Sequence, residues 1–236
     1  MKKLILFLIL PLFVGCSSTK ILKFTKKPDD IVKTTALTNF LKDNKNPKVV
    51  LRVPQNAYTV TESEKNEAYE GENQDYLYNA IENQLLSSGF IVRDRQLFNQ
   101  IVENEDNNID YKQLKDKSDT ELIIELIKID PSILYETNKY YDNKNNEKVD
   151  KYKKRRRYGA SIEFKIVMIS TNEFAGVYKF NYTPCVEGCV ISTSYKDQIY
   201  ERNKKKGEKG YEGVEKNILE DFVKNATRQL VDEMRK

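Results

Sequence analysis

The chain has 236 residues, with 40 Lys and Arg against 36 Asp and Glu, and it contains neither histidine nor tryptophan. Without histidine there can be no Ser-His-Asp or Cys-His catalytic set and no imidazole metal ligand, and the sequence holds no glycine-rich phosphate loop or zinc-type cysteine motif. We therefore predict no catalytic residue, no cofactor and no metal. Carboxylate pairs are plentiful, so an enzyme acting on envelope glycans stays an alternative.

The N-terminal segment has the layout of a bacterial export signal. Lys2 and Lys3 precede an apolar run over residues 4–14 that only Pro11 interrupts. As a helix this run would rise about 16 Å, roughly half of a ~30 Å hydrocarbon core, so it is too short for a permanent span. Residues 13–18, Phe-Val-Gly-Cys-Ser-Ser, resemble the lipobox of bacterial lipoproteins, although Leu is commoner than Phe at its first position.

The lipobox resemblance implies that residues 1–15 are a signal peptide and that Cys16 carries the lipid that anchors the protein to a membrane. An ordinary secretory signal with an incidental cysteine is the alternative. After removal of the signal, 38 basic residues face 36 acidic ones, and this balance predicts no nucleic-acid partner. Ser17 and Ser18 favour the cell outer membrane by analogy with enterobacterial lipoproteins. The domain is then expected in the periplasm, with exposure at the cell surface as the alternative.

The segment after the lipobox is polar. Residues 16–47 carry Pro28 and Pro47, and we predict a lipidated, flexible tether with one short helix over 35–42. The globular domain is expected over residues 48–236.

The first half of this domain is predicted to alternate strands and helices. Residues 49–53 are an apolar run bounded by prolines, which is typical of a buried strand. Apolar residues at helical spacing then predict a helix that Gly89 ends, followed by a strand over 90–95. Further helices are predicted over 96–103 and 111–117.

The second half is predicted to consist mainly of strands. Residues 121–129 have the apolar character of a central strand, and residues 162–168 and 174–182 alternate across a turn. The chain closes on a long amphipathic helix with an apolar stripe formed by Ile218, Phe222, Ala226, Leu230 and Met234. The predicted class is α/β (α+β), with a mixed sheet of about five strands flanked by helices.

Three segments resemble the family of curli secretion channels (CsgG-like) and its relatives, the penicillin-binding-protein activators (LpoB-like). Residues 81–97 resemble the family's helix, its G-F-x-V-x-[ED]-R strand and the following helix. Residues 119–124 stand in the place of its A-D-Y-L-I-x-G strand, and residues 162–172 resemble the strand that ends in V-x-T-G-E. The resemblance implies a non-enzymatic envelope lipoprotein that binds other proteins; some other α/β envelope domain is the alternative.

Two departures from the curli channels argue against a pore. Those channels carry transmembrane hairpins at positions that correspond here to residues 138–158 and 196–213. Both segments are strongly polar and lack the alternation of a lipid-facing strand. The LpoB-like alternative, a tethered domain that binds an envelope protein, is therefore favoured over an oligomeric channel component, and a homo-oligomer is left open.

Two further features are candidate sites. The densest charge run, at residues 151–158, could bind an anionic partner or could be a solvated hairpin tip; its basic members are Lys151, Lys153, Lys154, Arg155, Arg156 and Arg157. Cys185 and Cys189 flank a three-residue loop containing Gly188, which predicts a hairpin that holds them at disulfide distance. Free thiols or half of a metal site are the alternatives to the disulfide.

Overall fold

The computed structural model describes residues 19–54, 57, 74–98, 118–191 and 213–236. The signal peptide, Cys16, the helix predicted over 111–117 and most of that over 96–103 lie outside these residues. Residues 196–212, most of the second channel-hairpin position, also lie outside them.

The α+β class predicted from the sequence is confirmed, and the larger of two sheets contains all the predicted strands. Its six strands follow the order β2-β9-β8-β5-β3-β4, in which β3 runs parallel to both of its neighbours and the other pairs are antiparallel. The strands are β2 (Asp30–Lys33), β3 (Lys48–Arg52), β4 (Ile91–Arg93), β5 (Leu122–Thr137), β8 (Arg155–Met168) and β9 (Glu173–Tyr182).

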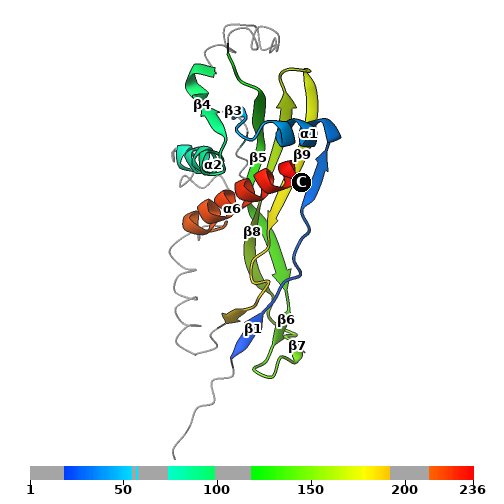
Figure 1. The fold of residues 1–236 in the computed structure, drawn as a ribbon. Helices are drawn as coiled ribbons and strands as arrows, with labels where there is room; N and C mark the ends of the chain where they lie inside the picture. Colours follow the sequence, from blue (N-terminus) through cyan, green and yellow to red (C-terminus); the bar gives the residue numbers. More distant parts are fainter. Residues whose placement is uncertain (1–18, 55–56, 58–73, 99–117, 192–212) are drawn as a thin grey trace, which may run out of the picture.

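A second sheet, which the sequence did not predict, lies at one end of the elongated molecule (Figure 1). It has the order β10-β1-β6-β7, with every pair antiparallel. Its strands are β1 (Lys20–Leu22), β6 (Lys139–Tyr141), β7 (Glu147–Val149) and β10 (Cys189–Ile191). The long strands β5 and β8 reach from the larger sheet toward it. The polar stretch over 136–158 thus contains the short strands β6 and β7. Neither strand has a buried residue, so the sequence shows no apolar alternation there.

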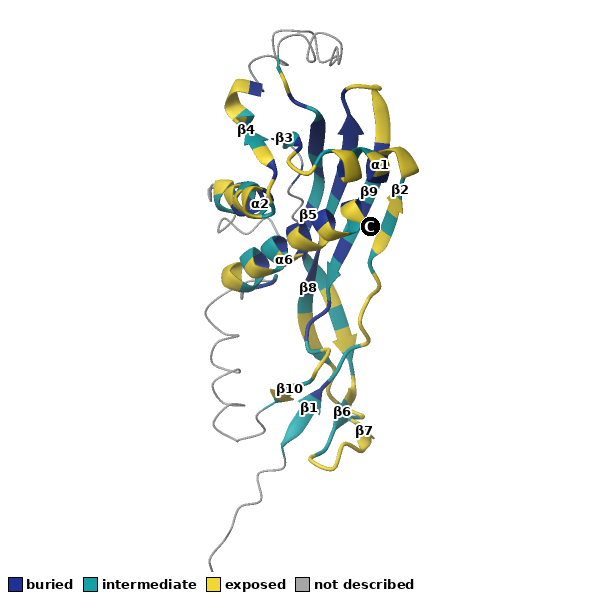
Figure 2. Cartoon of the chain, in the orientation of Figure 1, coloured by how far each residue is buried: buried dark blue, intermediate teal, exposed yellow. Residues whose placement is uncertain are grey.

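Within the described residues, one face of the larger sheet is covered by the helices α1 (Thr35–Asp43), α2 (Asp75–Ser87) and α6 (Lys216–Arg235). Their buried side chains form one apolar core with the inward residues of the strands (Figure 2). Gly89 ends α2 as predicted. It adopts φ 87°, and its N–H and that of Phe90 donate to the carbonyls of Leu86 and Leu85, the pairing of a Schellman motif.

The buried stripe of α6 differs in part from the prediction. Ile218 and Phe222 are only partly buried, and Leu219 and Val223 take the interior positions in the first half of the helix. A step of four residues advances about 40° around an α-helix, so a strict i+4 series drifts off the buried face.

The flexible tether predicted over residues 16–47 is wrong for residues 20–43. β1, β2 and α1 fall within it, and Leu22, Leu37 and Leu41 are buried. The short helix predicted over 35–42 is confirmed as α1, whose first turn is capped by the Thr34 hydroxyl accepting from the Leu37 N–H. The segment looked unstructured because two strands of three and four residues and one small helix need few apolar side chains.

Candidate functional site

The cysteine pair and the basic run lie at the same end of the molecule. We define the small-sheet end as residues 19–24, 136–158 and 184–191. These ranges comprise the second sheet, the turns next to it, and the ends of the larger-sheet strands β5 and β8 that reach it (Figure 1). Cys16, the predicted lipidation site, lies outside the described residues, four positions before the first residue of β1.

Cys185 and Cys189 are joined by a disulfide, with their Cα atoms 5.0 Å apart. The predicted β-hairpin is wrong, however, because β10 pairs with β1 rather than with β9. The loop closed by the disulfide therefore leads the chain from the larger sheet to the smaller one. Gly188 has φ 104°, and a Cβ there would lie 2.8 Å from Ile21 Cγ2, so the loop packs directly against β1.

The basic run divides into a turn and a strand. Residues 151–154 follow β7, whereas Arg155, Arg156 and Arg157 begin β8 opposite the end of β5. Glu136 accepts from Lys154 Nζ at 2.8 Å and from Arg156 Nε at 2.7 Å, and these hydrogen bonds lower the pKa of the Glu136 carboxyl. Arg155 Nη2 lies 3.6 Å from Asp150 Oδ2.

Acidic neighbours neutralise only part of the charge at this end. The small-sheet end holds eleven Lys and Arg against five Asp and Glu, a net charge of +6, whereas residues 16–236 together sum to +2. Aromatic rings lie among the cations, since Lys20 Nζ lies 4.4 Å from the ring centre of Tyr140 and Lys23 Nζ lies 5.0 Å from that of Tyr141. The Tyr152 side chain is 97% exposed.

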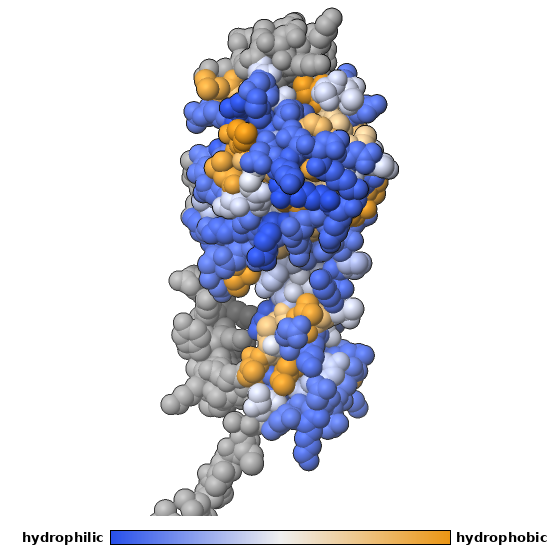
Figure 3. All heavy atoms as spheres, in the orientation of Figure 1, coloured by the Kyte–Doolittle hydropathy of each residue, from blue (hydrophilic) through white to orange (hydrophobic). Residues whose placement is uncertain are grey.

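The small-sheet end also exposes apolar side chains, on the face shown in Figure 3. Apolar side chains gather there over the region of β1 and β10, with hydrophilic side chains below them. Val190 of β10 is 69% exposed, and Val149 of β7 is 55% exposed. The small-sheet end thus combines cations, tyrosines and scattered exposed aliphatic side chains.

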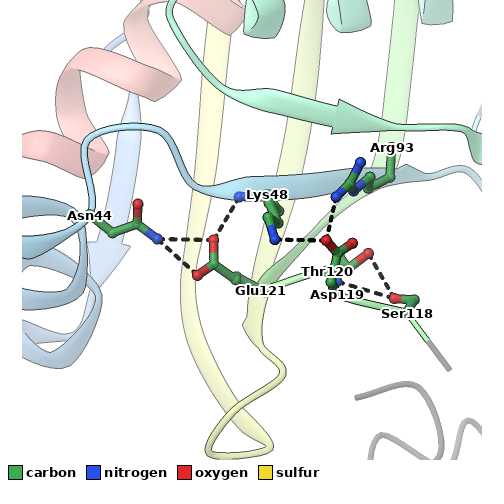
Figure 4. Close-up of polar contacts among 7 residues, drawn as sticks. All are labelled: Asn44, Lys48, Arg93, Ser118, Asp119, Thr120 and Glu121. Carbon is green, nitrogen blue, oxygen red and sulfur yellow. Dashed lines mark hydrogen bonds and ion pairs between the residues drawn. The ribbon is translucent and has the colours of Figure 1, made fainter. Parts of the chain in front are cut away.

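A second polar cluster, at the opposite end of the sheet, was missed by the sequence analysis (Figure 4). Asp119 accepts hydrogen bonds from Lys48 and Arg93, and these interactions, the one with Lys48 first, hold the pKa of the Asp119 carboxyl below its usual value. Glu121 accepts from the Lys48 backbone N–H at 2.7 Å and from Asn44 Nδ2 at 2.9 Å.

These contacts connect the starts of β3 and β5 with the end of β4, so the cluster aligns three parallel strands. An ionised carboxylate held between two cations is suited to structural pairing and not to general-acid chemistry at neutral pH. The pattern D-T-E before an apolar run was the only sequence signal for it. Within the described ranges, no three His, Cys, Asp or Glu side chains are grouped closely enough to hold a metal ion.

The face of the larger sheet opposite α1, α2 and α6 carries cross-strand ion pairs. We call it the charged face, and it consists of Asp30, Val32, Arg52, Glu125, Glu163, Lys165, Val177 and Lys179. Glu125 Oε1 lies 3.2 Å from Arg52 Nη1, and Glu125 Oε2 lies 3.6 Å from Lys165 Nζ. Glu163 Oε2 lies 3.7 Å from Lys179 Nζ. Val32, on the edge strand β2, is 61% exposed. A small apolar cluster that includes Val50, Ile123 and Phe98 lies next to these rows.

No helix in the described part of the chain has both the length and the apolar content of a membrane span. No family model matches the chain, and no curated protein matches it.

Several solved structures are similar to the chain in shape. A point variant of the PelC dodecamer from Paraburkholderia phytofirmans is 6% identical, with a TM-score of 0.39, and the match covers 89% of this chain and 100% of that one. A putative neuraminyllactose-binding hemagglutinin homolog from Helicobacter pylori is 10% identical, with a TM-score of 0.33 and coverage of 81% and 84%. Neither is a CsgG-like or LpoB-like protein, and at these TM-scores the likeness carries no argument about function.

Proposed function

We propose that this protein is a non-enzymatic, lipid-anchored protein of the bacterial outer membrane whose α+β body binds other envelope proteins. Its task would be to assist assembly, secretion or cell-wall synthesis. The observation that carries the proposal is the position of β1. The chain leaves the lipobox cysteine and enters the fold at one end of an elongated molecule, and the three helices lie toward the other end.

This arrangement would present the larger sheet and its helices to partners at a distance from the membrane. The charged face is the surface that best suits a protein partner. Its cations and carboxylates are paired across strands, so their desolvation is partly compensated, and exposed Val32 adds apolar area at the edge.

The finer assignment to the CsgG-like and LpoB-like lipoproteins is part of the same proposal. It is supported by the three sequence segments, which correspond to α2 with β4, to the start of β5, and to β8. The polar residues of the first channel-hairpin position, at 138–158, favour the LpoB-like alternative over a pore.

The anchor is tested by Cys16→Ala. We expect loss of acyl labelling and release from the membrane fraction, because this cysteine is the only one in the lipobox. The matched control is the double variant Cys185→Ser, Cys189→Ser, which should remain acylated and membrane-bound. Unchanged acyl label in Cys16→Ala would contradict the proposal.

The role of the charged face is tested by replacing one of its residues with a photo-crosslinking amino acid and crosslinking in intact cells. Position Lys179 on the charged face should give a discrete adduct with another envelope protein, identified by mass spectrometry. Arg228, an exposed position on α6, is the control and should give less of that adduct. Equal adducts at both positions would overturn the assignment of the face, and a ladder of self-adducts would favour the oligomeric channel.

A further inference from the structure

The sequence predicts a tether of about 30 residues between Cys16 and the domain, but in the structure the fold begins at Lys20. The domain therefore begins much closer to the proposed lipid anchor than the sequence predicts. Lys20 begins β1 and lies four positions after Cys16, with three residues between them. Four residues span at most about 14 Å. A lipid on Cys16 would therefore hold the small-sheet end next to the headgroups.

We infer that the small-sheet end docks on the anionic lipid surface in which the Cys16 lipid is inserted. This inference rests on the proposed lipid anchor. It fixes the orientation of the domain, with the second sheet against the membrane and the helices of the larger sheet directed away from it.

The charge distribution is the first argument. A net charge of +6 is concentrated at the end nearest the anchor, although residues 16–236 as a whole sum to only +2, so the rest of the mature chain is net acidic. Basic residues are attracted to an anionic leaflet only within about a Debye length, roughly 8–10 Å at ordinary ionic strength. The short connection keeps the basic end within that range.

The side-chain types are the second argument. Tyr152 is 97% exposed between Lys151 and Lys153, and Lys20 and Lys23 lie over tyrosine rings. Tyrosine with lysine or arginine is the combination that proteins place at headgroup level, because the ring tolerates the interface and the cation meets the phosphate. A solvated hairpin tip would not need exposed rings beside its cations.

The experiment uses two features of the chain. It contains no tryptophan, so Tyr152→Trp creates a single fluorescent reporter, and Cys16 is the one cysteine outside the disulfide. Mature protein, residues 16–236, is coupled through Cys16 to a maleimide lipid in vesicles of brominated phosphatidylcholine containing 30% phosphatidylglycerol. Phe174→Trp, on β9 at the opposite end of the larger sheet, is the matched control.

We expect at least twofold stronger bromine quenching at position 152 than at position 174. The difference should disappear on vesicles without phosphatidylglycerol and in 0.5 M NaCl. Adding Lys151→Glu, Lys153→Glu and Lys154→Glu should abolish it. Adding Lys42→Glu, Lys45→Glu and Arg228→Glu, the same charge change on the helix-bearing part, should leave it within about 20%, and circular dichroism should show that both triple variants are folded.

Equal quenching at positions 152 and 174 on anionic vesicles would overturn the inference, as would quenching at 152 that salt and lipid charge leave unchanged. Chemical coupling supplies the anchor here, so the result does not depend on lipidation in the cell. Failure of acyl labelling at Cys16 would remove the proposed anchor, whereas failure of the quenching experiment would remove only the docked orientation.

Discussion

The two sheets of this protein are stabilised in different ways. The larger sheet packs α1, α2 and α6 on a continuous apolar core that includes Phe164, Tyr178 and Phe180. The smaller sheet has a single buried side chain in its four strands, that of Leu22.

The smaller sheet depends instead on a disulfide, on lysine–tyrosine contacts and on the strands β5 and β8 that extend from the body. A few short strands without a hydrophobic face are not independently stable in water. The body therefore has to support the end that carries the candidate site, and surface chemistry at that end can vary at little cost to the fold.

The strongest test of this contrast compares an interior with an exposed aromatic residue. Phe164→Ala in β8 should lower the free energy of unfolding by about 3–5 kcal/mol, because the side chain is fully buried in the body core. Tyr152→Ala, at a position 97% exposed, should change it by less than about 0.5 kcal/mol. Urea unfolding measures both, and similar losses at the two positions would show that the small-sheet end contributes as much as the core.

The next test concerns the junction between the two regions. A Cβ at Gly159 would lie 2.4 Å from the Tyr182 carbonyl oxygen and 2.5 Å from Tyr135 Cε2, so Gly159→Ala should destabilise by about 3 kcal/mol. In this variant the rate of amide hydrogen exchange should increase first in β6 and β7. Ser161→Ala, two residues along the same strand, should cost less than about 1 kcal/mol. Exchange that rises equally in α6 would mean that the two regions open together.

A smaller effect is expected from the disulfide. The loop closed by Cys185 and Cys189 is short, so the double serine variant should lose about 2 kcal/mol or less in chain-entropy terms. The loss should be local, with faster exchange in β1 and β10 and an unchanged body. Mass spectrometry of unreduced protein should show the two cysteines linked. Free thiols in protein taken from the native envelope would contradict the prediction.

The smallest effect should come from the exposed cluster at the far end of the sheet. Hydrogen bonds from Lys48 and Arg93 lower the pKa of Asp119 in the folded state, so its ionised form stabilises the fold above the unfolded pKa of about 3.9. This contribution is lost as the pH falls through the lowered folded pKa. The stability difference between wild type and Asp119→Asn should therefore be complete at pH 7 and should decrease as the pH falls below the unfolded pKa, so that it is smaller at pH 3 than at pH 7.

Urea midpoints at the two pH values measure this difference. Lys48→Gln replaces the first of the two cationic donors by a neutral amide and should weaken the same pH dependence. A difference for Asp119→Asn that is as large at pH 3 as at pH 7 would assign the effect to packing instead of charge.

The elements that the sequence determined by itself are those with a strong local signal. The apolar run before Arg52, the alternation in β8 and β9, and the glycine that ends α2 are each set by residues close together in the chain. The cysteine pair is an intermediate case, because its short separation along the chain allows the disulfide, whereas the turn that brings the two sulfurs together is not the predicted hairpin.

Only the tertiary structure decided where the short polar segments go. β1 pairs with β10 and β6, and β2 pairs with β9, through backbone hydrogen bonds that join distant parts of the chain and require no periodic apolar pattern. The Asp119–Glu121 cluster likewise exists only because strands distant in sequence lie side by side, whereas most of the charge of the basic end lies within residues 136–158 and was visible in the sequence. Strands of three or four residues with few buried side chains have almost no local sequence pattern, so residues 20–43, which were predicted to be a tether, are part of the fold.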